Sequence, residues 1–156
     1  MKTKLFTSAV ICLVILGSFS LQQGKKPVNK KVGFEALGKE KGKYLSHANG
    51  TVSLQKGVQG ANEVFVLERL ANGHVALACI SAEQGKYLSH ANGQLSLQTG
   101  NQGEGEEWIF HAAGNDHLSL ECTGAETGKY LSHAFGKLWF QDGNQGDGEM
   151  WARRGY

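Results

Sequence analysis

The sequence predicts an all-β domain built from three copies of one unit, a β-trefoil. Three observations lead to this fold class: a repeat with a period of 43 residues, apolar residues that alternate as in strands, and glycine-rich turns between them. A fixed period of this size indicates supersecondary units that are stacked or arranged around an axis. We therefore expect three 43-residue units of four strands each, twelve strands in all, between Val32 and Tyr156.

The repeat is marked by the block Gly-Lys-Tyr-Leu-Ser-His-Ala, which begins at Gly42, Gly85 and Gly128. Two further sets of residues keep the same period, each at one position of the unit. They are the aromatic residues Phe65, Trp108 and Trp151, and the cysteines Cys79 and Cys122 with Ala36 in the matching place. Since the aromatic residues stay in step with the apolar pattern, we expect them in a common core.

Each unit contains short runs in which apolar residues alternate with others, such as Leu118 to Cys122. This alternation is typical of a strand with one buried face. Asn49-Gly50 and Asn92-Gly93 are typical of tight hairpin turns, because asparagine and glycine accept a positive φ at low cost.

The last unit has room for only three strands before the chain ends at Tyr156. Residues 32–37 align with 75–80 and 118–123, so we expect this N-terminal segment to supply the missing strand and close the last repeat. A β-propeller also uses four strands per repeat, but it typically has four to eight blades, and three would close poorly. A closed sheet leaves no exposed strand edges.

The first 31 residues are expected to lie outside this domain. Residues 1–20 combine Lys2 and Lys4 with an apolar run and then small residues, which is typical of a cleaved signal peptide. The run is shorter than the ~20 residues of a spanning helix, so a membrane anchor is the weaker alternative. Residues 21–31 are interpreted as a Lys-rich flexible leader and 32–156 as a single domain. We therefore expect a secreted, extracellular protein without a membrane span.

From Val32 onward the chain has ten basic and fourteen acidic residues. Nucleic acids and heparin-like partners usually require a concentrated basic face, which this composition does not predict. Nucleic acid is therefore not an expected partner. The leader lysines are interpreted as a solvated tail; they are Lys25, Lys26, Lys30 and Lys31.

The block Gly-Lys-Tyr-Leu-Ser, a following aromatic residue such as Trp108, and a strand of the type Gly73-His74-Val75-Ala76-Leu77 resemble the fascin-like repeat. The resemblance covers Val32 to Tyr156 and extends to hisactophilin-like single trefoils. It implies a β-trefoil fold. Fascins bundle actin with several trefoils in tandem, whereas this chain has one trefoil and an expected signal peptide. The resemblance therefore implies a structural or adaptor role toward a protein partner ahead of actin bundling.

Three histidines occupy one position of the unit, beside the hairpin turn: His47, His90 and His133. Imidazoles can hydrogen-bond sugar hydroxyls, and weak sites repeated on one rigid body gain from avidity. The alternative is that each histidine only supports its turn. A three-histidine metal site requires the rings to converge within ~2.1 Å of one ion. Hairpin ends do not favour that, so no metal or other cofactor is expected.

The glycine-rich loops before Trp108 and Trp151 carry amide and carboxylate groups that can both donate to and accept from hydroxyls. A simpler interpretation is that these loops are solvated turns. Their groups also resemble calcium ligands in type, but neither loop matches an EF-hand. The candidate ligand-binding residues in the loops are Asn101, Gln102, Asn144 and Gln145, together with Asn49 and Asn92 at the hairpin turns.

The third unit departs from the symmetry at Phe135 and Trp139, which replace asparagine and serine of the other two units. Leu138 and Phe140 take the inward positions, so we expect Trp139 to point outward. Two exposed aromatic side chains on one hairpin are costly unless something covers them. The candidates are a sugar ring, a protein partner, a second copy of the chain, or the leader.

Cys79 and Cys122 lie on the expected inward face, either as buried free thiols or, if their Cα atoms come within about 7 Å, as a disulfide. The sequence has no nucleophile elbow, no phosphate-binding glycine loop and no HExxH motif, so catalysis is not expected. We predict a non-catalytic module that binds a glycan or glycoprotein. The alternatives are a fascin-like adaptor that contacts protein through Phe135 and Trp139, and an inhibitor that presents one loop to a protease.

Overall fold

The computed structural model describes residues 29–58, 60–144 and 146–156. The expected signal peptide, most of the expected leader and Gln145 lie outside the described residues. The described chain is all-β, with twelve strands and eight short 3-10 turns. No helix within these ranges is long and apolar enough to cross a membrane.

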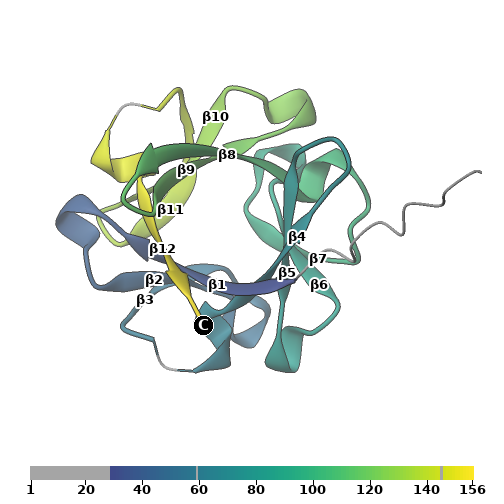
Figure 1. The fold of residues 1–156 in the computed structure, drawn as a ribbon, viewed down its shortest axis with the longest axis horizontal. Helices are drawn as coiled ribbons and strands as arrows, with labels where there is room; N and C mark the ends of the chain where they lie inside the picture. The colour runs from purple at the N-terminus through teal and green to yellow at the C-terminus, as the bar shows by residue number, and fades with distance from the viewer. Residues whose placement is uncertain (1–28, 59, 145) are drawn as a thin grey trace, which may run out of the picture.

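The strands come four to a unit, and Figure 1 shows the three units as lobes around a common axis. The first unit holds β1 (Lys30–Ala36), β2 (Lys43–Ser46), β3 (Ser53–Lys56) and β4 (Phe65–Arg69). The second holds β5 (Val75–Cys79), β6 (Lys86–Ser89), β7 (Ser96–Thr99) and β8 (Glu107–Gly114). The third holds β9 (His117–Cys122), β10 (Lys129–Ala134), β11 (Lys137–Asp142) and β12 (Trp151–Gly155).

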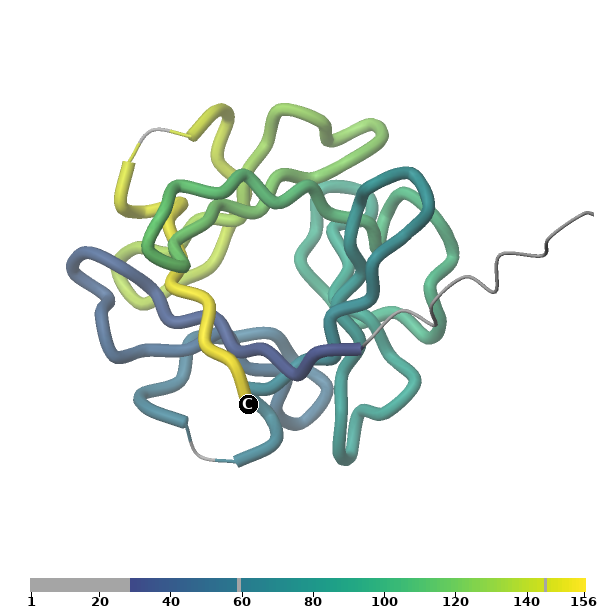
Figure 2. Tube along the Cα trace, viewed as in Figure 1, coloured from purple at the N-terminus to yellow at the C-terminus, as the bar shows by residue number. Residues whose placement is uncertain are grey.

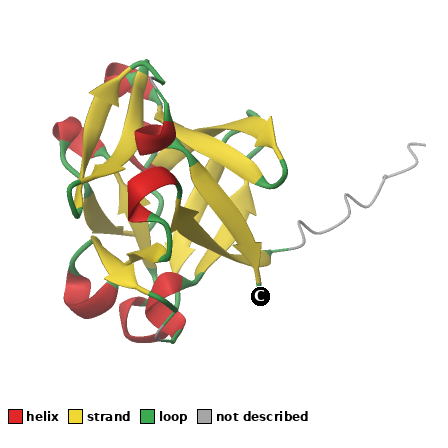
Figure 3. Cartoon of the chain, turned by 90° about the vertical axis from the view of Figure 1, so that its left-hand side faces the viewer, coloured by secondary structure: helices red, strands yellow, loops and turns green. Residues whose placement is uncertain are grey.

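Single 3-10 turns lie between many of the strands. They are η1 (Gly38–Glu40), η2 (Ala48–Gly50), η3 (Ala61–Glu63), η4 (Ser81–Glu83), η5 (Ala91–Gly93), η6 (Glu104–Glu106), η7 (Gly124–Glu126) and η8 (Asp147–Glu149). Figure 3 shows these turns spread over the outside of the strands.

Six strands close into a barrel and the other six form three hairpins. Antiparallel pairing runs from β1 through β4, β5, β8, β9 and β12, and returns from β12 to β1. The hairpins are β2–β3, β6–β7 and β10–β11. Figure 2 follows the trace around this ring. A six-stranded barrel with three hairpins is the β-trefoil architecture, so the predicted all-β fold with twelve strands is confirmed.

β1 is paired on both sides, with β12 along most of its length and with β4 at its start. Lys30 and Lys31 pair with Leu67 and Val66 of β4, so the strand begins two residues before Val32, the expected start of the domain. The ladder to β4 gives these two residues backbone partners, which a solvated tail would lack. The Tyr156 amide also donates to the Lys31 carbonyl at 3.2 Å, so both ends of the described chain lie side by side.

The core forms where the three copies of each apolar position meet. Phe65, Trp108 and Trp151 are fully buried, as predicted. The two indole N–H groups donate to the carbonyl oxygens of Leu88 and Leu131, each at 3.1 Å and each twenty residues earlier in the chain. Equivalent positions therefore occupy equivalent environments, which fixes the hairpins of the second and third units in the same way.

Candidate functional site

The three repeat histidines are buried and do not face solvent. His47, His90 and His133 are 2 % exposed or less. Each packs edge-to-face on the buried aromatic residue of its own unit, with ring centroids 4.5–5.0 Å apart. Each Nε2–H donates to a backbone carbonyl oxygen 2.8–3.2 Å away. The expectation that these rings contact a ligand at the surface does not fit this burial. Each ring instead holds its hairpin against a residue that comes 17 positions later, at the start of the next strand or just before it.

The other ring nitrogen of each histidine has no partner. Since a carbonyl oxygen can only accept, these contacts place the proton on Nε2 and leave Nδ1 bare. At His90 the Thr123 amide also faces Nε2, at 3.3 Å, but the contact with the Glu107 carbonyl is shorter, at 2.8 Å. All three Nδ1 atoms are buried without a hydrogen bond in the described chain. Burial lowers the pKa of His133 below its usual value, because a second proton would be held away from water. The rings lie in three separate units, and no group of three metal-ligating side chains forms among the described residues.

Phe135 stands out among the hairpin turns. Asn49, Asn92 and Phe135 share one position and one left-handed conformation, with φ of 55°, 57° and 50°. Asparagine tolerates this conformation, whereas for phenylalanine it costs about 1 kcal/mol. The Phe135 side chain is also 89 % exposed. An exposed aromatic residue in a strained conformation is an outlier from which a function can be argued.

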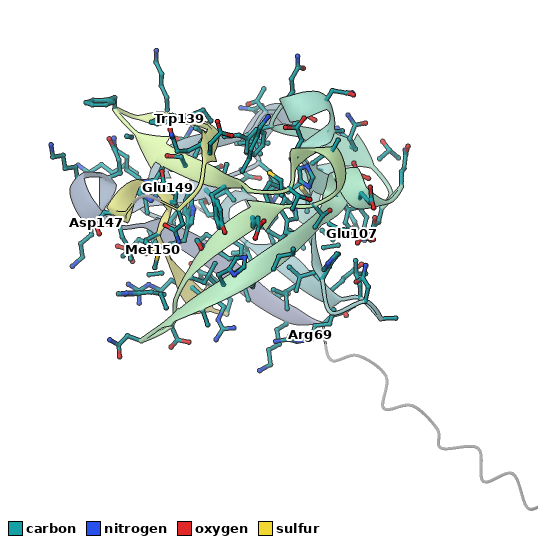
Figure 4. The ribbon with its side chains drawn as sticks, turned by 90° about the horizontal axis from the view of Figure 1, so that it is seen from above. Arg69, Glu107, Trp139, Asp147, Glu149 and Met150 are labelled. Carbon is teal, nitrogen blue, oxygen red and sulfur yellow. The ribbon has the colours of Figure 1, made fainter. Side chains whose placement is uncertain are left out.

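Phe135 lies at a cleft of about 220 Å³ between the first and third units, which we call the Phe135 cleft. Three segments build it: η1, the turn between β10 and β11, and η8. In Figure 4 Asp147 of η8 lies at the outer edge of the molecule, with Glu149 and Met150 nearby. The lining residues are Leu37, Lys39, Glu40, His133, Ala134, Phe135, Asp147 and Gly148.

Two carboxylates line the Phe135 cleft. Glu40 accepts a hydrogen bond from the Gly136 amide at 2.9 Å and pairs with Lys43. The Lys43 hydrogen bond, and next the Gly136 amide, hold the pKa of Glu40 below its usual range, so this carboxyl is ionised at neutral pH. Asp147 lies over Gly38, where an added Cβ would come within 2.8 Å of the Asp147 Cβ. Glu40 is thus fixed in place, while the exposed Asp147 is accessible to a ligand.

The same cleft recurs 43 residues earlier between the second and third units, with a volume of about 210 Å³. Here Asn92 takes the place of Phe135, and Glu104 takes the place of Asp147. At the third boundary the matching positions hold Ala61 and Asn62, so the second carboxylate is missing there. The residues of this Asn92 cleft are His90, Ala91, Asn92, Glu104, Gly105, Thr123, Ala125 and Glu126.

The loop amides predicted as ligand contacts are engaged within the fold and line neither cleft. Asn101 accepts the Gly103 amide at 3.2 Å. The Gln102 side chain donates to the Thr99 carbonyl at 2.8 Å, and Asn144 donates to the Ser119 hydroxyl at 3.0 Å. Gln145 lies outside the described residues.

Trp139 and Phe135 lie on one hairpin but line different hollows. Trp139 is half-buried, and its indole N–H donates to Gln141 at 3.3 Å. It lines an open depression where the three hairpins meet. Apolar residues of β3, of β11 and of the turn before β7 form the walls of this depression. Two exposed aromatic residues were expected on this hairpin, and only Phe135 is fully exposed. The apolar neighbours of Trp139 in this depression are Val52, Leu54, Leu95, Leu138 and Phe140.

Cys79 and Cys122 are buried free thiols, which decides between the two possibilities open from the sequence. Burial raises the pKa of both thiols to about 12. A thiol needs to ionise to act as a nucleophile, so neither cysteine is reactive at neutral pH.

Sequence reasoning missed Lys39 and Glu40, and it included Asp147 only as one of the carboxylates of the glycine-rich loops. A signal for Glu40 was present, because an acidic residue recurs at this position three residues before the lysine of the repeat block. The contact of Glu40 with Gly136 depends on which units become neighbours, and the pattern alone does not give that. The recurring ion pairs are Glu40–Lys43, Glu83–Lys86 and Glu126–Lys129.

No protein-family model and no curated protein matches this sequence. Solved structures match its fold. The designed threefold-symmetric protein ThreeFoil superposes with a TM-score of 0.65 at 18 % identity, over 79 % of this chain and 96 % of its own. SeviL, solved with an asialo-GM1 saccharide bound, superposes with a TM-score of 0.65 at 14 % sequence identity, over 81 % of this chain and 97 % of its own. A GlcNAcα1-4Gal-releasing endo-β-galactosidase from Clostridium perfringens superposes with a TM-score of 0.66 at 14 % sequence identity. The match covers 81 % of this chain but only 32 % of the enzyme.

At these identities the matches establish the β-trefoil fold alone. ThreeFoil and SeviL are covered almost completely, whereas the enzyme is matched over about a third of its length, so that similarity concerns one part of it. The fascin-like resemblance rests on the sequence blocks and receives no support from these matches beyond the shared fold class.

Proposed function

We propose that this protein is a secreted, non-catalytic carbohydrate-binding module and that the Phe135 cleft is its principal glycan site. One observation carries the proposal: a phenyl ring that is 89 % exposed stands at a cleft with two carboxylates. The apolar face of a sugar ring packs on an aromatic side chain, and its hydroxyls donate to carboxylate oxygens.

The residues of the Phe135 cleft have different roles in binding a sugar. Phe135 offers the packing surface, Asp147 accepts from hydroxyls, and Lys39 donates to ring or hydroxyl oxygens. Glu40 holds the turn through the Gly136 amide, so the phenyl ring is kept in position before the ligand arrives. Such preorganisation reduces the entropy lost on binding.

The Asn92 cleft is a second, weaker site of the same kind, because it keeps Glu104 but has no aromatic residue. Two related sites on one rigid body increase the avidity for a branched or clustered glycan. The fold supports this idea by analogy, since the trefoil SeviL is known with a saccharide bound. Secretion is proposed from residues 1–20 of the sequence.

A glycan array probed with the full chain tests the proposal. Phe135→Asn removes the ring but keeps a residue that the other two units use at this turn. Together with Asp147→Asn, it is expected to reduce array binding at least about tenfold, the loss of one or two good contacts. Val58→Ala alters an exposed apolar residue elsewhere and serves as control. Undiminished binding by Phe135→Asn would show that the cleft is not the site.

The alternative is a fascin-like adaptor that uses Phe135 to bind protein. The same exposure favours it, because large exposed aromatic residues also mark protein interfaces. A chain that binds no glycan, and whose self-association or capture of a partner is lost in Phe135→Asn or Trp139→Ala, would support the adaptor. Sedimentation of the parent and the two variants separates these outcomes.

A further inference from the structure

The end of the barrel that holds the start of β1 and the end of β12 gathers positive charge. This end, which we call the barrel mouth, is formed by the start of β1, the end of β12, and the turns β4–β5 and β8–β9. Figure 4 places Arg69 at this end of the molecule and Trp139 at the opposite end. Arg69 and Arg153 line two hollows here, of about 450 and 370 Å³, and belong to both of them together with Asp116.

Four cationic side chains and one carboxylate surround the hollows. Lys30, Lys31 and Arg69 are exposed and form no ion pair within residues 29–58, 60–144 and 146–156. Arg153 pairs with Asp116 at 2.9 Å, but the Asp116 side chain is 65 % exposed. An ion pair this exposed contributes little to stability, so an incoming anion can also bind the Arg153 guanidinium.

This concentration contrasts with the rest of the domain, where the acidic residues outnumber the basic ones. Several of those carboxylates have a basic partner of their own, as Glu35 has in Arg154. Burial acts to raise the pKa of Glu35, but the hydrogen bond and charge of Arg154 outweigh it, and the pKa is lowered. Counting charges along the chain predicts no basic face, because Lys30 and Arg69 are 39 positions apart in the sequence. Pairing of β1 with β4 brings them to one rim.

The hollows have an apolar floor beneath the charged rim. Val32 and Leu67 line one of them, and Phe110 and Leu118 line the other. Arginine guanidinium groups bind the oxygens of sulfate or phosphate in a two-pronged manner. A ligand that fits this arrangement carries several such anionic groups on a body that can lie against apolar residues.

We propose that the barrel mouth binds a sulfated polysaccharide, with Arg69 and Arg153 as the two principal anion contacts and Lys30 and Lys31 extending the track. A chain-like ligand is favoured because the two hollows adjoin and share Arg69 and Arg153, so consecutive sugar residues can occupy both. A membrane surface fits less well, since the apolar and cationic groups line recesses. This site is separate from the Phe135 cleft and does not depend on it.

Binding of a heparin-derived octasaccharide to the full chain, measured by calorimetry at about 0.1 M salt, tests the proposal. Arg69→Gln with Arg153→Gln is expected to weaken binding at least about tenfold. Lys41→Gln with Lys137→Gln removes the same number of charges from other exposed positions and should change affinity by less than about twofold. Asp116→Asn removes the resident carboxylate and should strengthen binding.

Three comparisons identify the ligand chemistry. The desulfated octasaccharide should bind at least about tenfold more weakly, and affinity should fall steeply as salt is raised from about 0.05 to 0.3 M. Inorganic sulfate should compete only weakly. The proposal is overturned if the octasaccharide does not bind, if the control pair loses as much affinity as the arginine pair, or if phosphatidylserine vesicles bind in its place. Phe135→Asn should leave octasaccharide binding unchanged, so this site and the glycan cleft can fail independently.

Discussion

The carboxylate of Glu40 accepts a hydrogen bond of 2.9 Å from the amide of Gly136, which lies 96 residues later in the chain. The bond joins η1 of the first unit to the hairpin turn of the third. Glu83 faces the turn at Gly50 in the same way, and Glu126 faces the turn at Gly93. Each unit therefore reaches its neighbour with one acidic side chain, and the turn beside the Phe135 cleft is held from outside its own unit.

Replacement of Glu40 tests this connection. Glu40→Gln weakens the hydrogen bond to Gly136 and removes the charge that pairs with Lys43, so we expect Tm to fall by a few degrees and glycan affinity to fall with it. Glu83→Gln is the matched control, because it removes the equivalent charge at another boundary. It should lower Tm similarly and leave binding at the Phe135 cleft unchanged. Equal effects of both variants on glycan binding would refute a positioning role for Glu40.

The strained turn predicts a gain in stability when Phe135 is replaced. Phe135→Asn should raise the free energy of unfolding by about 1 kcal/mol, because asparagine accepts the left-handed conformation more readily. Asn92→Phe should lower it by about the same amount and, by supplying the missing ring, strengthen glycan binding at the Asn92 cleft. Urea denaturation of the two variants measures both changes. A loss of stability in Phe135→Asn would mean that the ring is stabilised by contacts that outweigh the strain.

The buried His133 predicts a loss of stability at mildly acidic pH. Above its usual pKa of 6.5 the ring is neutral in both folded and unfolded chains and adds no pH dependence. Below that value the unfolded chain binds the proton more readily than the folded chain, so the free energy of unfolding falls as pH falls. Carboxyl groups with a lowered pKa, such as Glu40 and Glu107, reduce the free energy of unfolding only when the pH falls below about 4.5.

His133→Gln separates the histidine from the carboxyl groups. Glutamine can still donate to the Met150 carbonyl but does not titrate. The slope of unfolding free energy between about pH 6.5 and 5 should therefore become shallower in this variant, whatever its overall stability. An unchanged slope would assign the acid sensitivity to other groups.

The two core thiols should be unreactive while the chain is folded. Their pKa of about 12 leaves almost no thiolate at neutral pH, and both are buried. A maleimide reagent followed by peptide mass spectrometry should find Cys79 and Cys122 unmodified in the native protein and modified in urea. Modification of either in the folded state, or a bridge between them, would contradict the packing described above.

The repeat predicts the fold well because the argument needs only the position of each residue within its own unit. Phe65, Trp108 and Trp151 share one position, so whatever buries one of them buries all three. The orientation of His47, His90 and His133 could not be derived in this way. Each lies at a strand end, where alternation allows either face, and the choice was decided by a carbonyl oxygen 17 residues away.

Features that join different units were harder still to predict. Glu40 with Gly136, and Arg69 with Arg153, become neighbours only when the ring of strands closes. The sequence gives the spacing of units but not which side chains meet across their boundaries. Trp139 illustrates the same limit, since the depression that it lines is completed by residues of the other two hairpins.

The pairing of β1 with β12 places the start of β1 and the end of β12 where the other units have the turns β4–β5 and β8–β9. A ring of three equivalent units has no intrinsic beginning. A short peptide joining Tyr156 to Asn29, with a new opening cut at the turn of residues 70–73, would rebuild the same contacts from a permuted gene.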